Sequence, residues 1–326
     1  MRICVIGAGA LGGSYGGRLA LAGADVTLVD VWQAHVEAIG RDGLRLDGVP
    51  GDRRVRVAAA TGPQGLAPFD MAIVTVDANH SGEAAKTAAA ALKPDGFALT
   101  LQNGIGNVET LVAALGRARV VGGSSMCSAA VQGPGHVTQT HQGPTTVGEL
   151  DGGGSPRVDA LKALLEGAGF DTRIAPDVLA VIWQKFLLNL SINPICAVTG
   201  LRLGELARLP AVDAFQDRII AEALAVVAAK GLNLPDPDIR GTIKRHTWSK
   251  YSRPSMLQHV DMGRRTEIDA LNGALVREAQ ALGVAVPFNE ALTALVKGRE
   301  FARMRAVNEP DVDYDALESA AGPWPG

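Results

Sequence analysis

The chain has 326 residues, 47% of them hydrophobic and 20% charged, so it can bury a large core, and its length predicts two domains. A formal net charge of -3, with no dense block of Lys or Arg, argues against a nucleic-acid partner. Cys4, Cys127 and Cys196 form no CxxC pair, so we expect neither a disulfide framework nor a metal site, and a cytoplasmic location fits best.

In the first half of the chain, short apolar runs alternate with helical segments. This alternation predicts an α/β fold with a Rossmann-type, doubly wound, mostly parallel sheet over residues 1–175. In such a sheet, ligands bind at the carboxyl ends of the strands. The expected strands are 2–6, 25–29, 71–76, 97–102, 120–130 and 171–174, and the expected helices are 10–22 and 81–92.

Shorter β-prone runs, separated by Gly and Pro, predict two added hairpins. The first joins 44–46 to 54–58, and the second joins 136–140 to 145–150.

Residues 176–307 show only helical periodicity, which predicts an all-α second domain. The tail, 308–326, is polar and contains proline, so we expect it to be loosely ordered. No run of about 18 consecutive apolar residues predicts a membrane span, and no membrane partner is expected.

The strongest motif is a glycine-rich turn after the strand ICVI. Gly7 permits the tight turn, Gly9 lets the backbone approach a pyrophosphate, and Gly12 lets helix and strand pack closely. Backbone amides near Ala10 and Leu11 then lie at the positive end of the following helix. A glycine turn with a purely structural role is the alternative, but the strand and helix around the motif favour a dinucleotide.

Asp30 ends the next strand, 18 residues after Gly12. A carboxylate here accepts hydrogen bonds from an adenosine ribose and repels a 2'-phosphate, which favours NADH. No Arg or Lys lies between Asp30 and Arg41 to bind that phosphate. A turn-initiating aspartate is the alternative interpretation.

Two further features carry amides. Asn103, in Gln102-Asn103-Gly104, follows a strand at the crevice and could bind cofactor or substrate, or form an ordinary turn.

Lys185, Asn189 and Asn193 follow one another at i, i+4 and i+8, so they share one helical stripe about 12 Å long. Apolar neighbours suggest that this polar stripe is buried and needs partners, or is a seam between domains.

Ser255 and Glu267 lie at two expected helix starts, Ser255-Met-Leu-Gln258 and Thr266-Glu-Ile-Asp269. Both have the spacing of a capping box, so capping alone could explain them.

With these motifs in order, the chain resembles the ketopantoate reductase family along almost its whole length. The resemblance implies NADPH-dependent reduction of a 2-keto acid, which for the eponymous members is 2-dehydropantoate to pantoate in pantothenate biosynthesis. It implies that Lys185 is the general acid and that Glu267 supports it. It further implies that Asn103, Asn189, Asn193 and Ser255 line the cofactor and substrate site, and it suggests a homodimer.

The sequence departs from the family pattern at three points. Asp77 stands where the family usually has a lysine, His259 replaces an acid that often follows the SMLQ segment, and the basic residue expected near Asp30 for NADPH is missing. We therefore expect a carbonyl substrate other than ketopantoate to be the best one. The alternatives are a related dehydrogenase acting on a different alcohol, keto or opine-type substrate, and a dinucleotide-sensing protein without turnover.

Overall fold

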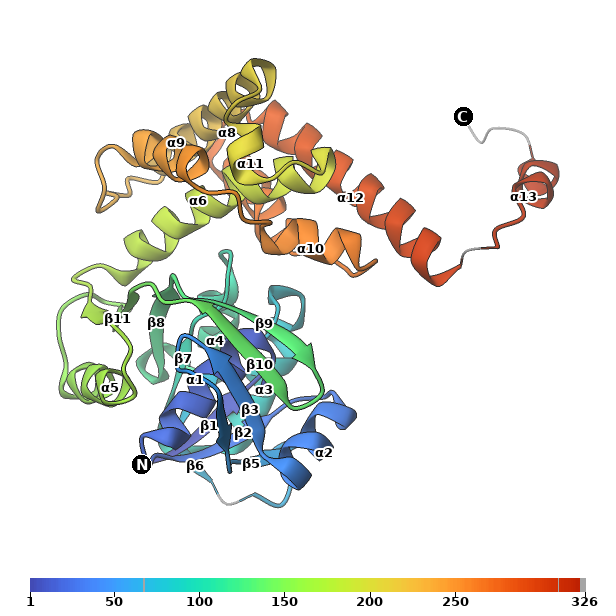
Figure 1. Cartoon of the computed structure of the whole chain (residues 1–326). Helices are drawn as coiled ribbons and strands as arrows, with labels where there is room; N and C mark the ends of the chain where they lie inside the picture. Colours follow the sequence, from blue (N-terminus) through green and yellow to red (C-terminus); the bar gives the residue numbers. More distant parts are fainter. Residues whose placement is uncertain (67, 310, 323–326) are drawn as a thin grey trace. The chain divides into compact units, whose positions relative to one another are not determined.

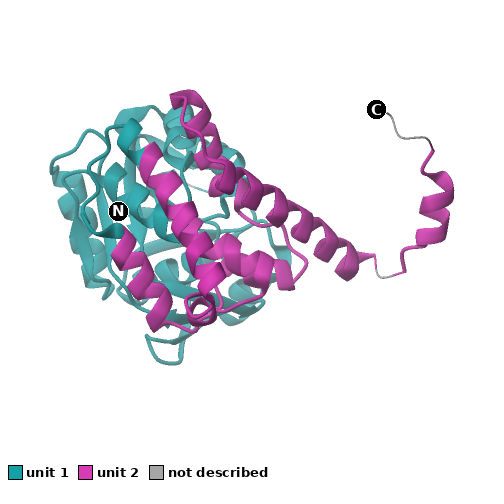
Figure 2. Cartoon of the chain, turned by 90° about the horizontal axis from the view of Figure 1, so that it is seen from above, with its two compact units in different colours: residues 1–189, 227–239 teal, residues 190–226, 240–326 magenta. Residues whose placement is uncertain are grey.

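The computed structural model describes residues 1–66, 68–309 and 311–322, and its chain divides into two compact units (Figures 1 and 2). Unit 1 contains residues 1–189 and 227–239, and unit 2 contains residues 190–226 and 240–326. This division falls within the helix α6 (Val178–Thr199), whose first residues belong to unit 1 and whose last residues belong to unit 2.

Unit 1 is built on an eight-stranded sheet, as the alternation of strands and helices predicts. Neighbouring strands are parallel except for the antiparallel pair of β8 and β11. In spatial order the strands are β12 (Thr172–Ile174), β11 (Thr145–Glu149), β8 (Val120–Ser125), β7 (Leu92–Thr100), β6 (Phe69–Val74), β1 (Arg2–Ile6), β2 (Asp25–Val29) and β5 (Ala58–Ala60). From β1 the chain runs to β2 on one side and later to β6 on the other, which makes the end of β1 the topological switch point.

A second sheet has the order β4 (Arg53–Val55), β3 (Leu44–Gly48), β10 (His136–His141) and β9 (Ser128–Gly133). The predicted pairing of 44–46 with 54–58 is largely confirmed by the antiparallel pair β3–β4. The predicted hairpin of 136–140 with 145–150 is wrong, since β10 pairs with β9 and β3 while β11 joins the large sheet. Gly135, with a φ of 72°, makes the β9–β10 turn, and the expected strand 120–130 is in fact two strands.

Helices cover both faces of the large sheet. The helices α1 (Ala10–Leu21) and α5 (Pro156–Gly167) share one core with β3 and β10, whereas α3 (Ser81–Ala91) and α4 (Asn107–Leu115) share the other with the start of α6. Four alanines of α3 are buried in the core that this helix shares with the sheet, and such small side chains let the helix pack closely. After β2 the chain enters α2 (Gln33–Asp42), which contacts the edge strand β5.

In unit 2 the described residues form helices and no strand, as predicted. They are α6 (Val178–Thr199, beginning in unit 1), α7 (Leu203–Leu206), α8 (Pro210–Ala229, with its last residues in unit 1), α9 (Ile239–Ser249), α10 (Ser255–Asp261), the 3₁₀ turn η3 (Ile268–Ala270), α11 (Asn272–Leu282), α12 (Pro287–Asn308) and α13 (Tyr314–Ala320).

The helix α6 continues through Pro194. Because proline has no backbone N–H, the carbonyl of Leu190, four residues earlier, loses its usual helical donor. The Asn272 side-chain amide donates to that carbonyl at 3.2 Å, and Asn272 is fully buried. One buried amide therefore compensates for the proline.

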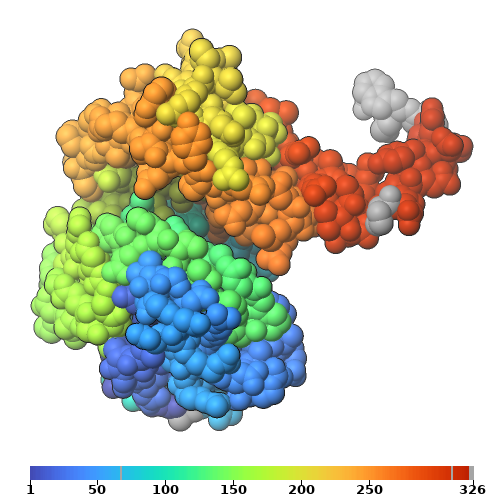
Figure 3. Space-filling model, viewed as in Figure 1, coloured from blue at the N-terminus to red at the C-terminus, as the bar shows by residue number. Residues whose placement is uncertain are grey.

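By length and composition, α6 is the one helix of the described chain that could cross a membrane, yet 56% of its most apolar window is buried within the protein. Burial of this extent is typical of a helix that packs in a protein core. In the tail, which we expected to be loosely ordered, α13 is helical, and all of its residues are exposed (Figure 3).

Candidate cofactor and catalytic site

The glycine-rich loop lies at the switch point, between the end of β1 and the start of α1. Gly7 has a φ of 91°, which favours glycine, and a Cβ on Gly12 would lie 1.8 Å from the carbonyl oxygen of Gly7. A Cβ on Gly9 would meet no atom of the chain within 4 Å, so this side of the loop is open. These three environments fit a pyrophosphate bound at the amino end of α1.

Thr75, which sequence reasoning missed, helps to fix the loop. Its hydroxyl donates to the carbonyl oxygen of Gly7 at 2.8 Å, and its backbone N–H donates to Ile6. Thr75 follows β6 directly, and β6 neighbours β1. A hydroxyl at the end of the strand beside the glycine turn is the signal that could have found it.

The Asp30 side chain holds the same loop from the other side. Its Oδ2 accepts from the backbone N–H of Ala8 at 2.8 Å, and its Oδ1 accepts from the N–H of Trp32 at 2.9 Å. Asp30 therefore does initiate a turn, as the alternative interpretation states. Each carboxylate oxygen can accept a second hydrogen bond, so ribose binding is compatible with this role.

Buried amides organise the turn after β7. Gln102 donates to the carbonyl of Val76 at 3.1 Å and to the hydroxyl of Ser81 at 2.8 Å. Ser81 in turn donates to Asn107, whose amide donates to the backbone carbonyl of Asn103 at 2.7 Å. Gln102 therefore acts as a structural support for the turn that presents Asn103. Ser81 and Asn107 were missed from the sequence, although Asn107 lies four residues after Asn103.

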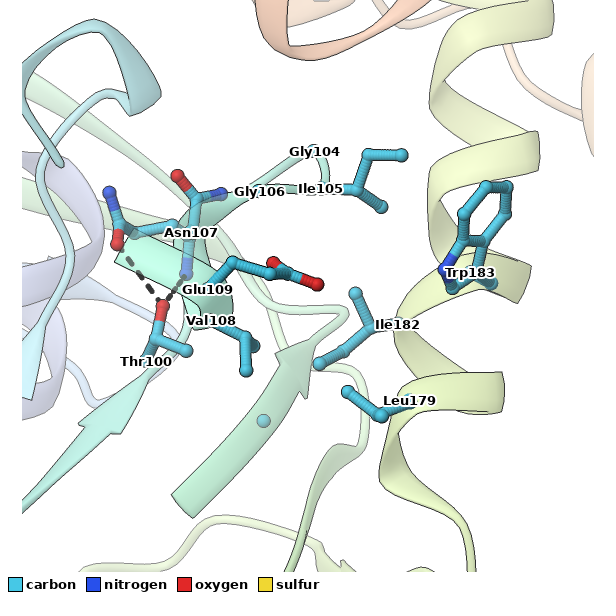
Figure 4. Close-up of a pocket in the computed structure, with 12 residues that line it drawn as sticks. Thr100, Gly104, Ile105, Gly106, Asn107, Val108, Glu109, Leu179, Ile182 and Trp183 are labelled. Atoms are coloured by element: carbon cyan, nitrogen blue, oxygen red, sulfur yellow. Dashed lines mark hydrogen bonds between the residues drawn. The ribbon is translucent and has the colours of Figure 1, made fainter. Parts of the chain in front are cut away.

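Lys185 lines a small pocket in unit 1, beside this turn. The pocket is bounded by Gln102, Gly104, Gly123, Ser124, Ile182, Lys185 and Phe186. A second pocket shares four of these residues and extends between α4 and the first turns of α6, where Leu179, Ile182 and Trp183 face Ile105, Val108 and Glu109 (Figure 4). Lys185 is half-buried, and it shares this pocket with Gln102 and Gly104 of the turn that follows β7.

The remaining predicted residues belong to different parts of the chain. Asn189, half-buried, follows Lys185 on α6 within unit 1. Asn193, Ser255 and Glu267 belong to unit 2, where Asn193 and Glu267 are buried and Ser255 is exposed at the start of α10. Neither Ser255 nor Glu267 makes a side-chain cap, so capping does not explain these residues. Their place in the site stays a prediction.

Asp77 follows the end of β6 and caps the 3₁₀ turn η1 (Ala78–His80). Its Oδ1 accepts from the backbone N–H of Asn79 at 2.9 Å and from the side-chain amide of Asn79 at 2.7 Å. The carboxylate is thus oriented by its own turn, and it does not line the Lys185 pocket.

Cys4 and Cys196 offer no reactive thiolate. Burial raises the pKa of Cys4 and of Cys196 to about 12, so both are thiols at neutral pH. Within the described residues no three His, Cys, Asp or Glu side chains cluster as metal ligands. A dinucleotide loop and a pocket lysine therefore remain as the chemical groups of the site.

Comparison with known proteins finds relatives along most of the chain. The family model "Ketopantoate reductase PanE/ApbA" matches residues 3–152, and its C-terminal counterpart matches residues 177–300. The 2-dehydropantoate 2-reductase of Pyrococcus horikoshii is 31% identical over 300 residues, covering 92% of this chain and 98% of the relative.

Two solved structures share the fold. The PanE/ApbA family ketopantoate reductase of Ralstonia eutropha JMP134 is 33% identical with a TM-score of 0.86, covering 93% of this chain and 99% of the other. A D-mandelate dehydrogenase, solved with NADH and anilino(oxo)acetate, is 25% identical with a TM-score of 0.88 over the same shares of the two chains.

The fold and the site define a nicotinamide-dinucleotide-dependent oxidoreductase, one of the class that reduces 2-keto acids. Within that class, the chain belongs to the ketopantoate reductase family.

Proposed function

We propose that this protein reduces a 2-keto acid, or a related carbonyl compound, to the corresponding hydroxy compound in the cytoplasm, with Lys185 as general acid. The observation that supports this most is the placement of Lys185 in one pocket with the turn that presents Asn103, at the carboxyl end of a sheet whose glycine loop fits a dinucleotide. A non-catalytic sensor would have no need for a lysine at this position.

The chain's own residues supply position and charge. When bound, the nicotinamide dinucleotide supplies the hydride. The Lys185 ammonium stabilises the negative charge that develops on the carbonyl oxygen and then donates a proton to it. The amides of Asn103 and Asn189 are suited to orient the substrate, since each offers both a donor and an acceptor. The Gln102, Ser81 and Asn107 network keeps the Asn103 turn in place during this step.

For the substrate, we expect a carbonyl compound other than ketopantoate to have the highest kcat/KM, and a larger, neutral or differently charged compound should be least affected by Asp77. Exchange of the family's lysine for Asp77 changes the charge at a crevice-facing strand end by two, and like charges repel a carboxylate substrate. The measurement is a panel of 2-keto acids and 2-hydroxy acids in both reaction directions with both cofactors. The similarity to a D-mandelate dehydrogenase supports a panel that includes aromatic 2-keto acids.

Two variants separate the charge of Asp77 from its capping role. Asp77→Asn removes the charge but keeps an oxygen that can accept from Asn79, and Asp77→Lys restores the family's charge. Both should raise kcat/KM for ketopantoate. If ketopantoate is already the best substrate of the unmodified protein, at about 10⁴ M⁻¹s⁻¹ or more, then Asp77 does not act on the substrate.

For the cofactor, we propose that NADH binds at least tenfold more tightly than NADPH. The Asp30 carboxylate is fixed by the N–H groups of Ala8 and Trp32, so it cannot readily turn away from a 2'-phosphate. Titration calorimetry with both cofactors measures the ratio. Asp30→Asn, which keeps one acceptor oxygen, should reduce the preference. A tenfold preference for NADPH in the unmodified protein, about 1.4 kcal/mol, would refute this role of Asp30.

A further inference from the structure

The backbone of Ala8 lies between the first two glycines of the loop, and both its N–H and its carbonyl oxygen have a side-chain partner. Its N–H donates to Asp30 Oδ2 at 2.8 Å, and its carbonyl oxygen lies 3.0 Å from Nε2 of His35. Because a carbonyl oxygen only accepts, Nε2 of His35 must carry the proton and donate it. Two side chains from the segment that follows β2 therefore hold the two peptide groups on either side of the Ala8 Cα.

The second ring nitrogen of His35 has its own partner. Nδ1 accepts from the backbone N–H of Gly135 at 2.9 Å. An acceptor at Nδ1 and a donor at Nε2 define one neutral tautomer of the imidazole. The ring is 0% exposed and stacks on Trp32 with centroids 5.1 Å apart and planes 6° apart. His35 is thus fixed in position, in plane and in tautomer.

Gly135 lies in the turn between β9 and β10, and its carbonyl oxygen accepts from the N–H of Arg45 on β3. His35 therefore ties the glycine-rich loop to the β9–β10 turn of the small sheet, where Gly135 lies 100 residues further along the chain. The sequence reading assigned no role to His35.

We propose that His35 is a positioning residue for cofactor binding. By holding the Ala8 carbonyl, it keeps the loop in the conformation that the pyrophosphate requires before the cofactor arrives, and this preorganisation lowers the entropy lost on binding. The proposal rests on dinucleotide binding at the Gly7–Gly12 loop, which belongs to the proposed function. It concerns affinity for the cofactor and not the proton transfer at Lys185.

A buried histidine could instead serve only the stability of α2, and a matched control distinguishes the two roles. Ile39 lies on the same helix, is 1% exposed and belongs to the core of unit 1. Ile39→Ala should lower the melting temperature by leaving a cavity, but should leave cofactor affinity unchanged at temperatures where the protein is folded.

The test is titration calorimetry of NADH and of ADP-ribose with the full chain. His35→Leu removes both hydrogen bonds, and His35→Asn keeps an oxygen that can accept from Gly135 but is too short to reach Ala8. Loss of the bond to Ala8 should raise the Kd of both ligands about tenfold in each variant. At saturating NADH, kcat should stay within about twofold of the unmodified value, because the reacting groups are unchanged.

Three outcomes decide the matter. If His35→Asn folds and binds both ligands as tightly as the unmodified protein, His35 is a structural residue and the proposal is wrong. If Ile39→Ala weakens binding as much as the His35 variants do, the effect is one of general stability, and the proposal is again wrong. If the unmodified protein binds neither ligand, the proposed function is wrong, and the role of His35, which depends on it, is wrong as well.

Discussion

Replacement of Lys185 by alanine should lower kcat by about 100-fold or more while the Kd of the cofactor stays nearly unchanged. The lysine lines the pocket beside the Asn103 turn, whereas the glycine loop is supported by Thr75, which donates to Gly7, and by Asp30, which accepts from Ala8. Loss of the ammonium group removes the proton donor and the charge that stabilises the developing oxyanion. Steady-state kinetics and calorimetry on the same preparation measure the two effects separately.

Lys230 provides the matched control. It also belongs to unit 1, and its ammonium group lies 5.6 Å from the centre of the Trp183 ring, near the same helix but outside the Lys185 pocket. Lys230→Ala should keep turnover close to that of the unmodified protein. Near-normal turnover in Lys185→Ala would instead make Lys185 a polar seam residue, and the general acid would have to be sought elsewhere.

Much of the large sheet could be predicted because its strands are short apolar runs bounded by Gly and polar residues. Burial on both faces requires such runs in a parallel sheet. The partners of the peripheral strands could not be predicted in the same way. Thr145–Glu149 is a short β-prone run that would suit either sheet, and only the three-dimensional structure shows that it pairs with β8 rather than with β10.

In the candidate site, too, some features could be predicted from the sequence and others could not. The glycine loop and Asp30 follow from local spacing, since strand, turn, helix and second strand occur in order. The support of Asn103 by Asn107 and Ser81, and of Ala8 by His35, depends on side chains whose partners are set by packing. His35 looks like an ordinary helical residue in the sequence, because its partner Gly135 lies in a turn of a different sheet.

Replacement of Gly12 by alanine should abolish most cofactor binding, with a Kd raised by about 100-fold or more. A Cβ at this position would lie 1.8 Å from the backbone oxygen of Gly7 and 2.4 Å from the hydroxyl of Thr75, so α1 and the loop must move apart. Such overpacking should also destabilise the fold by about 1–3 kcal/mol. Chemical denaturation measures the second effect and calorimetry the first.

Gly9 separates the two effects, because a Cβ there would meet no atom of the chain within 4 Å. Gly9→Ala should therefore leave the free energy of unfolding nearly unchanged and still weaken cofactor binding, since its methyl group would occupy the open side of the loop where the backbone must approach the pyrophosphate. Gly40→Ala, in an equally open position on α2, should change neither quantity in an unfavourable direction. If Gly9→Ala binds NADH normally, the open side of the loop does not face the phosphates. The fit between this loop and a dinucleotide would then rest on Gly7 and Gly12 alone, whose close contacts are equally compatible with a purely structural turn.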